Sequence, residues 1–469
     1  MKKKLLLIGV VDLESYSGRK NVLPITVIKS WQPIQFGIIA AITPDDWEID
    51  MIDEYFEPFS FRKADLVGIS ASSTSINRAY RIAQIFKKEN IPVVIGGMHA
   101  SFYPEEASQY VDIVAVGKAE GVWQNILNDF NNKALKKIYY SDPDVKVIFK
   151  PKRDIFKKYG YSIGNIISSI GCPNKCDFCN RPIFQNYKYH LRNVDEIVDE
   201  IKEIEQHYFI FNDDNFFGTT DKHIERTVEL FNKMIKAKIK KRWLCHTSVN
   251  ITKYPEVLKL AGEAGCVSVF VGLESFDIDE LLQFSKHTNK KYVEDDYKSA
   301  IKVFHKNKMP VSGAFICGGE KETLESIVKK AHAIRNTKLD NIVYSFLTPL
   351  PKTPLFEKYF KEGKLLYTNF PEDWIYYNFF NVTFKTEHGS PEQFFDAYLK
   401  TMGIIYGHHK GLIKDDNIYR FFLAILNTRS VKNVIDFHIF QSFYNLGGYR
   451  SVFWKIMFKL RRPKITFNR

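Results

Sequence analysis

Three cysteines stand close together just before the middle of the chain, at Cys172, Cys176 and Cys179. Thiolates are the ligands of soft metal centres, and Gly171 and Pro173 beside them indicate a turning loop on which the three sulfurs can converge. No further cysteine or histidine follows at the short spacing of a structural zinc site. Three thiolates leave one iron of a four-iron cluster open to a substrate. A structural zinc completed by a remote residue is the alternative.

Carboxylates follow two apolar segments further along the chain. Asp213 and Asp214 come directly after the segment 208–212, and Glu274 follows the segment 267–273. A carboxylate at the end of a buried strand needs a partner, because an unpaired charge is costly to bury. The paired carboxylates suit an ammonium group, although a solvated turn or a helix cap would also explain them.

Glycine and small polar residues end three apolar runs in the first third of the chain. These residues and their near neighbours are Ser70, Ser73, Thr74, Gly96, Gly97, His99, Ser101, Gly117 and Glu120. Bare glycine backbone and hydroxyl groups let a ligand approach the carboxyl edge of a parallel sheet closely. We therefore expect a ligand-binding edge here, with a flavodoxin-like domain that binds another ligand or none as the alternative.

The strands and helices that must position these residues are predicted to form an α/β fold. Continuous apolar runs separated by amphipathic segments predict a doubly wound parallel sheet, Rossmann-like, in residues 1–140. The expected strands are 5–11, 48–53, 65–70, 92–97 and 112–117, with a helix at 76–88. A linker of poor periodicity covers 141–161.

A second alternation of strands and helices covers residues 162–370. Its six expected strands are 164–169, 208–212, 242–250, 267–273, 311–317 and 341–347. Six β/α units predict a partial barrel, (β/α)6, whose chemistry lies on loops at the carboxyl ends of the strands. The remainder, 371–469, is rich in aromatic residues and is expected to be mainly helical.

Composition restricts the class of protein. None of the six cysteines precedes Cys172, and three of them are clustered, which favours a reducing cytoplasm over a disulfide framework. No apolar run is long enough for a transmembrane helix. The net charge of +13 is spread over the chain without a finger or RNA-binding signature, so we expect no nucleic-acid partner.

The cysteine spacing, with Phe178 before the third cysteine and a partial barrel around it, resembles the radical S-adenosylmethionine (SAM) superfamily. The resemblance implies a 4Fe-4S cluster on the three cysteines, whose open iron binds SAM. It implies reductive cleavage of SAM to a 5′-deoxyadenosyl radical, with electrons from an external flavodoxin- or ferredoxin-type donor. The SAM contacts that it implies are Phe178, Asp213, Asp214, Ser248 and Glu274. Cys317-Gly-Gly-Glu320 looks like the superfamily's amine-binding triplet but follows the fifth barrel strand, so we expect a turn there.

The strand ends of the first domain, together with Pro104-Glu105-Glu106-Ala107, resemble the cobalamin-binding domain fused to many radical SAM enzymes. The resemblance implies that the nine strand-end residues named above bind cobalamin. No Asp-x-His-x-x-Gly motif is present, so we expect no histidine ligand beneath the cobalt. Lys118 departs from the pattern, since relatives commonly carry an acid there.

The two resemblances together imply a cobalamin-dependent radical SAM methyltransferase. Such an enzyme moves a methyl group from methylcobalamin to an unactivated carbon after the radical has abstracted a hydrogen. The aromatic C-terminal third favours a bulky apolar small molecule such as a lipid or a tetrapyrrole. The alternatives are a non-methylating cyclase or oxidoreductase of the anaerobic tetrapyrrole cyclase type, and a zinc-stabilised binding module without turnover.

The C-terminal end has helical periodicity. Val452, Phe453, Ile456, Met457 and Leu460 fall on one helical face, with basic residues largely opposite. This pattern predicts a basic amphipathic helix that either attaches to an anionic membrane surface or packs on the barrel. The expected location is therefore the cytoplasm, with or without a peripheral contact at the inner face of the membrane.

Overall fold

The computed structural model describes residues 2–11, 32–142, 145, 147–285, 289 and 294–406. The chain divides into two compact units. The first unit comprises Met1–Phe216 and Thr348–Phe384, and the second comprises Phe217–Leu347 and the chain from Lys385 onwards. The domain boundaries expected from the sequence stay a prediction.

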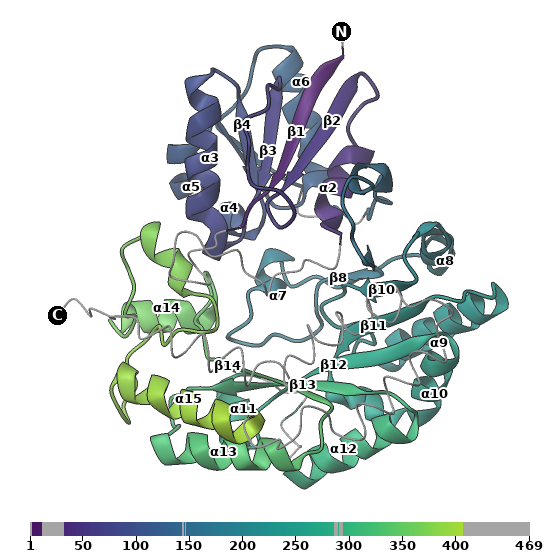
Figure 1. Cartoon of the computed structure of the whole chain (residues 1–469), viewed down its shortest axis with the longest axis vertical. Helices are drawn as coiled ribbons and strands as arrows, with labels where there is room; N and C mark the ends of the chain where they lie inside the picture. The colour runs from purple at the N-terminus through teal and green to yellow at the C-terminus, as the bar shows by residue number, and fades with distance from the viewer. Residues whose placement is uncertain are drawn as a thin grey trace. The chain divides into compact units, whose positions relative to one another are not determined.

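The first unit begins with a six-stranded sheet in the order β2-β1-β3-β4-β5-β6 (Figure 1). Its strands are β1 (Lys3–Gly9), β2 (Trp47–Asp53), β3 (Leu66–Ser70), β4 (Val93–Gly96), β5 (Ile113–Val116) and β6 (Ile138–Tyr140). All neighbouring pairs are parallel. Leu5 to Ile8 of β1 are at most 1% exposed, because helices cover both faces of the sheet. The short edge strand β6 was not expected, since three residues give no periodicity.

In the described part of this domain, five α-helices accompany the sheet. They are α2 (Ile34–Ala41), α3 (Ile76–Lys88), α4 (Met98–Phe102), α5 (Pro104–Tyr110) and α6 (Trp123–Asn131). Helices α3 and α5 lie on the opposite face of the sheet from α2 and α6 (Figure 1). Strand β1 lies between β2 and β3, so the chain winds in opposite directions on its two sides. In doubly wound sheets, ligands bind outside the carboxyl ends of the strands at such a switch point.

A second six-stranded sheet has the order β14-β13-β12-β11-β10-β7. Its strands are β7 (Ile163–Ile166), β10 (Tyr208–Phe211), β11 (Arg242–Thr247), β12 (Cys266–Glu274), β13 (Val311–Cys317) and β14 (Asn341–Phe346). The six strands expected for a partial barrel are thereby confirmed. The first of them is shorter than expected, because the chain leaves the sheet after Ile166 and forms a small antiparallel pair, β8 (Ser169–Ile170) with β9 (His190–Leu191).

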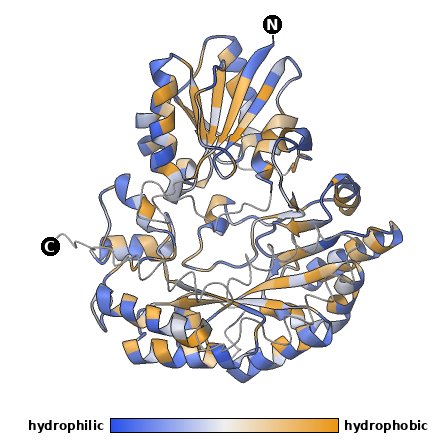
Figure 2. Cartoon of the chain, viewed as in Figure 1, coloured by the Kyte–Doolittle hydropathy of each residue, from blue (hydrophilic) through white to orange (hydrophobic). Residues whose placement is uncertain are grey.

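The longer of the remaining helices are amphipathic. Figure 2 shows apolar residues on the strands of the second sheet and both apolar and polar residues on the helices around it. The remaining helices are α7 (Arg181–Phe184), α8 (Val194–Glu203), α9 (Asp221–Lys236), α10 (Pro255–Glu263), α11 (Ile278–Gln283), α12 (Glu294–Lys306), α13 (Leu324–Asn336), α14 (Pro354–Lys361) and α15 (Pro391–Tyr406). Among the described ranges, no helix combines the length and apolarity needed to span a bilayer. The basic helix expected at 452–460 lies outside the described residues.

A buried ion cluster joins α11 and α13 in the second unit. The Lys330 ammonium lies 2.7 Å from the Glu280 carboxylate and 2.5 Å from the Glu322 carboxylate. Burial alone would lower the pKa of Lys330, but the two carboxylates outweigh it and raise that pKa. Glu322 also accepts hydrogen bonds from the amides of Gly318 and Gly319, so the cluster fixes the turn after β13.

Replacing Lys330 with alanine should lower the free energy of unfolding by about 3–5 kcal/mol, because two buried carboxylates lose their cation. Chemical denaturation followed by circular dichroism measures the loss. The matched control is Lys329→Ala, which removes an exposed lysine from the same helix and should change stability little. Equal stability of the two variants would show that Lys330 does not hold the cluster together.

Candidate functional site

The cysteine loop starts at Gly171, where any other residue would strain the backbone. Gly171 has a φ of +88°, and a Cβ there would collide with the carbonyl oxygen of Lys188. The pair β8–β9 closes the base of the loop, joining Ile170 to His190. Backbone pairing and a glycine turn therefore determine where the cysteines begin.

The three cysteines lie on this one loop and none is in a disulfide. Cys176 is 8% exposed, while Cys172 and Cys179 are half-buried. The Cys179 amide donates to the Cys176 carbonyl at 3.1 Å, which makes a turn between the last two ligands. Within the described residues, no three cysteine, histidine or acidic side chains form a site for a single metal ion. The donor set of three thiols on one turning loop fits a 4Fe-4S cluster.

The paired carboxylates after β10 have different surroundings. Asp213 is 1% exposed and accepts hydrogen bonds from the Ser168 amide at 2.7 Å, the Ser169 amide at 3.1 Å and the Ser168 hydroxyl. Ser168 lies just after β7 and Ser169 begins β8, directly before the cysteine loop. Asp213 thus braces the backbone that leads into the cysteine loop.

Asp214 faces a cation instead. Its carboxylate lies 3.4 Å from the Nε of Arg181, two residues beyond the last cysteine. Burial raises the pKa of Asp214, and Arg181 opposes that rise. Of the two carboxylates, Asp214 is the better candidate for an ammonium partner, because Asp213 already accepts three hydrogen bonds from the protein. Arg181 was missed by the sequence reasoning, although its position directly after the Cys179-Asn180 pair was a usable signal.

The loop after β14 also reaches the cysteine loop. The Leu355 amide donates to the Asp177 carbonyl at 3.2 Å, which links the start of α14 to the residue before Phe178. Phe178 itself is half-buried. The segment 348–384 therefore contributes to the surroundings of the cysteines within the first unit.

The other two expected SAM contacts lie in the second unit. Ser248 is 4% exposed and precedes a 3-10 helix at Val249–Lys253. Glu274 ends β12 with a φ of +66°, next to a register shift in the pairing with β13. Asn289 and Tyr297 hold this strand end by donating to the Leu273 carbonyl at 3.1 and 2.9 Å. A strained backbone held by its neighbours at a strand end is typical of functional sites.

The turn expected at Cys317-Gly-Gly-Glu320 is present. The amides of its two glycines donate to Glu322, at 2.5 and 3.0 Å, rather than pointing at a ligand. This use of the amides inside the protein agrees with the expectation that the resemblance to an amine-binding triplet is a coincidence of sequence.

The carboxyl edge of the first sheet contains two structural glycines and one open glycine. A Cβ at Gly97 would lie 2.7 Å from the Ala71 carbonyl oxygen, and one at Gly117 would lie 2.9 Å from the Ser141 Cβ. A Cβ at Gly96 would meet nothing closer than 3.8 Å. Packing therefore does not require glycine at position 96, whose bare backbone leaves room for a ligand and fits a cobalamin-binding edge.

Among the hydroxyl residues of this edge, Ser101 has a structural role. Its hydroxyl donates to the Gly97 carbonyl at 2.8 Å and accepts from the Gly117 amide at 2.9 Å, so it ties two strand ends together. Ser70, Ser73 and Thr74 are half-buried; Ser70 ends β3, and the other two follow it. Burial raises the pKa of Glu120, beside Lys118, in the loop after β5.

His99 is fully buried and uses both ring nitrogens inside the protein. Its Nδ1 lies 3.0 Å from the Ser73 hydroxyl, and its Nε2 lies 3.0 Å from the Glu106 carboxylate. His99 could reach a ligand only by giving up one of these contacts. The sequence reasoning named His99 as a cobalamin contact and did not single out Glu106.

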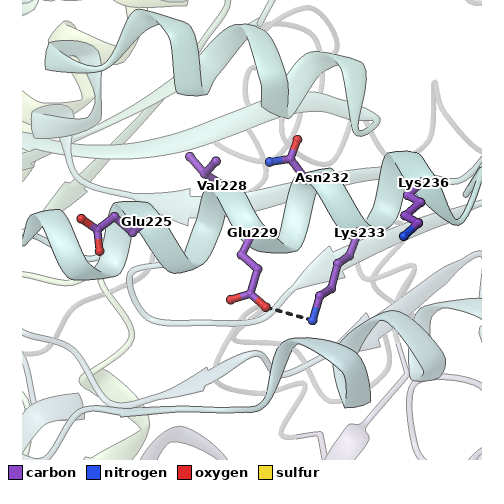
Figure 3. A pocket seen from close by; sticks show the side chains of 6 residues that line it. All are labelled: Glu225, Val228, Glu229, Asn232, Lys233 and Lys236. Carbon is purple, nitrogen blue, oxygen red and sulfur yellow. Dashed lines mark ion pairs between the residues drawn. The ribbon is translucent and has the colours of Figure 1, made fainter.

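Two surface hollows lie away from these residues. Figure 3 shows an open one along a single face of α9, where Glu229 and Lys233 form an ion pair of 2.9 Å. A second hollow is lined by residues of the linker and of α8, among them Lys150, Arg153 and Glu203. Neither hollow contains a residue expected to bind a cofactor.

Comparison with known proteins identifies two domains in the chain. The family described as the radical SAM superfamily matches residues 166–334, and the B12 binding domain family matches residues 21–127. The bacteriochlorophyllide d C-8(2)-methyltransferase of Chlorobaculum tepidum is 28% identical over 391 residues, covering 79% of this chain and 84% of that protein. The C-12(1)-methyltransferase of the same organism is 28% identical over 393 residues, covering 80% and 82%.

A solved structure shares the fold. The radical SAM methyltransferase TsrM from Kitasatospora setae, with cobalamin and a 4Fe-4S cluster bound, has a TM-score of 0.65 at 14% identity and covers 94% of this chain and 99% of that one. An anaerobic magnesium-protoporphyrin IX monomethyl ester cyclase from Rubrivivax gelatinosus is 28% identical over 344 residues, covering 65% of this chain and 60% of that protein.

The fold and the two family matches define a radical SAM enzyme with a cobalamin-binding domain. The chain belongs to the cobalamin-binding radical SAM enzymes, and its cofactors are a 4Fe-4S cluster, SAM and cobalamin. The family, fold class and cofactors expected from the sequence are thereby confirmed. The assignment of individual SAM and cobalamin contacts stays a prediction.

Replacing Gly171 with alanine should prevent the cysteine loop from leaving β8 correctly, at a cost of about 1–3 kcal/mol of local strain. We expect iron incorporation during anaerobic reconstitution to fall sharply, while cobalamin binding persists. The control is Gly160→Ala, where an added Cβ meets no atom within 4 Å. Normal iron content in Gly171→Ala would show that the glycine turn does not position the cysteines.

Proposed function

We propose that this enzyme is a C-methyltransferase that replaces an unactivated C–H bond of a small molecule with C–CH3. The proposal rests on the order of the two matched domains and on relatives named as methyltransferases that align over about four fifths of both chains. The bound cluster would supply the electron that cleaves SAM, and cobalamin would supply the methyl group.

The chain's own residues would hold these groups. Cys172, Cys176 and Cys179 would ligate three irons, leaving the last iron for the amino and carboxylate groups of SAM. Asp214, in its low-dielectric surroundings, would accept a hydrogen bond from the SAM ammonium. Asp213 would keep the strand end and the cysteine loop in register.

The atoms balance in the proposed reaction. One SAM and one electron from an external flavodoxin- or ferredoxin-type donor give methionine and a radical that takes the substrate hydrogen, leaving 5′-deoxyadenosine. A second electron from the same donor would return cobalamin to the Co(I) state, and another SAM would then restore its methyl group and leave as S-adenosylhomocysteine. Each methylated product should therefore be accompanied by one equivalent of each of these by-products.

The substrate class that we propose is a bulky apolar small molecule, with tetrapyrroles as the first to test. The named activities of the two bacteriochlorophyllide methyltransferases support this choice. A non-methylating cyclase is the second candidate, supported by the matched anaerobic cyclase. A cytoplasmic location and a peripheral membrane contact by the C-terminal segment rest on sequence pattern only.

Anaerobic incubation with SAM carrying a labelled methyl group distinguishes the two candidates. We expect a chlorophyllide-type tetrapyrrole to gain one labelled methyl group in place of hydrogen, as measured by mass spectrometry. Loss of hydrogen or gain of oxygen without label would support the cyclase instead. SAM cleavage that no tetrapyrrole stimulates would contradict the proposed substrate class.

Replacing Cys176 with alanine should abolish iron binding and SAM cleavage, because two thiolates cannot hold the cluster. Cobalamin should still bind, since its expected contacts lie on the first sheet. Iron analysis and the yield of 5′-deoxyadenosine provide the measurements. The control Cys266→Ala removes a buried thiol of β12 and should keep the iron. Retained SAM cleavage in Cys176→Ala would overturn the cluster assignment.

A further inference from the structure

Glu106 receives hydrogen bonds from three segments that are far apart in the sequence. The Tyr80 hydroxyl on α3 donates to its Oε1 at 2.9 Å, and His99 Nε2 lies 3.0 Å from the same oxygen. The Trp374 indole N–H donates to Oε2 at 2.9 Å. Burial alone would raise the pKa of Glu106, but these hydrogen bonds outweigh it and hold that pKa below its usual value. Glu106 is therefore ionised at neutral pH.

An ionised carboxylate has no hydrogen to give, so each of its partners must donate. His99 must therefore carry a hydrogen on Nε2. Its other nitrogen, Nδ1, lies 3.0 Å from the Ser73 hydroxyl oxygen. This second contact fixes the position of the Ser73 hydroxyl, because His99 is itself held by Glu106. Since His99 is 0% exposed, water does not compete for either contact.

A hydroxyl has one hydrogen and two lone pairs, so Ser73 can bind a ligand while it keeps its contact with His99. Ser73 begins the short 3-10 helix that follows β3, beside the switch point between β1 and β3. Its neighbours Ser72, Thr74 and Ser75 bond to one another instead, with hydroxyl oxygens 3.1 and 3.2 Å apart. Ser73 is half-buried and so can be reached from the carboxyl edge of the sheet.

We propose that Glu106 is a positioning residue for the cobalamin site. Through His99 it orients the Ser73 hydroxyl toward a hydrogen bond with an amide side chain at the periphery of the corrin ring. This inference rests on the proposed binding of cobalamin at this edge of the sheet. It assigns His99 to the relay rather than to direct contact with the cofactor.

The two oxygens of Glu106 serve different segments, which provides an internal control. Oε1 faces His99 and the relay, whereas Oε2 faces Trp374 of the segment 348–384. Trp374 is 1% exposed and stacks on Phe370, with ring centroids 3.8 Å apart. Trp374→Phe removes the bond to Oε2 but keeps an aromatic ring in this cluster.

The test is a double-mutant cycle on the full-length protein, purified without oxygen and titrated with hydroxocobalamin. We expect Glu106→Gln and Ser73→Ala each to weaken cobalamin binding about tenfold, the effect of one hydrogen bond. Because both changes break the same relay, the double variant should bind no more weakly than Ser73→Ala alone. The control Glu105→Gln alters an exposed neighbour and should bind as the wild type does.

Several results would overturn the inference. Additive losses of about a hundredfold in the double variant would mean that Glu106 does not act through Ser73. Wild-type affinity in Glu106→Gln would remove its role altogether. A loss in Trp374→Phe as large as that in Glu106→Gln would assign the effect to packing. If Glu106→Gln fails to fold, His99→Gln replaces it in the cycle, with the same expected loss.

The outcome separates this inference from the proposed function. Cluster absorbance and SAM cleavage, which depend on the cysteine loop, serve as folding checks in every variant. If the wild-type protein does not bind cobalamin, the proposed function itself fails. If the wild type binds and Glu106→Gln binds equally well, only the relay is wrong.

Discussion

One buried carboxylate, Asp213, connects the first barrel strand to the loop that carries the cysteines. Asp213 accepts hydrogen bonds from the amides of Ser168 and Ser169 and from the Ser168 hydroxyl. A buried carboxylate without such donors would lower the stability of the fold. Gly171 then turns the chain where no side chain fits. The starting point of the cysteine loop is thus determined by hydrogen bonds and sterics of the chain itself, to which a cluster would add its own constraint.

Polar residues at the edge of the first sheet have two different roles. Some polar residues there bind the protein itself, as Ser101 does between Gly97 and Gly117. Others remain accessible, as Ser73 does, but are oriented by buried groups behind them. Rigid support behind an accessible group reduces the ordering cost of binding. Large cofactors bind well at such edges because the backbone is already in place.

The shared fold leaves the chemical outcome to smaller features. TsrM shares the architecture at 14% identity, and both methyltransferases and a cyclase are among the relatives. A scaffold that places a cluster and a corrin can support more than one fate of a substrate radical. The reaction of this enzyme is therefore identified by its product and not by its fold.

The sequence alone determined most of the strands and the grouping of the three cysteines. Strands such as β3 and β13 are continuous apolar runs, and the cysteine spacing is local, so both leave a direct pattern in the sequence. Only the tertiary structure distinguished Asp213, which braces the backbone, from Asp214, which faces Arg181. It also joined Glu106 to Trp374, which are 268 positions apart. Partners so distant leave no periodic signal, because their meeting depends on how whole elements pack.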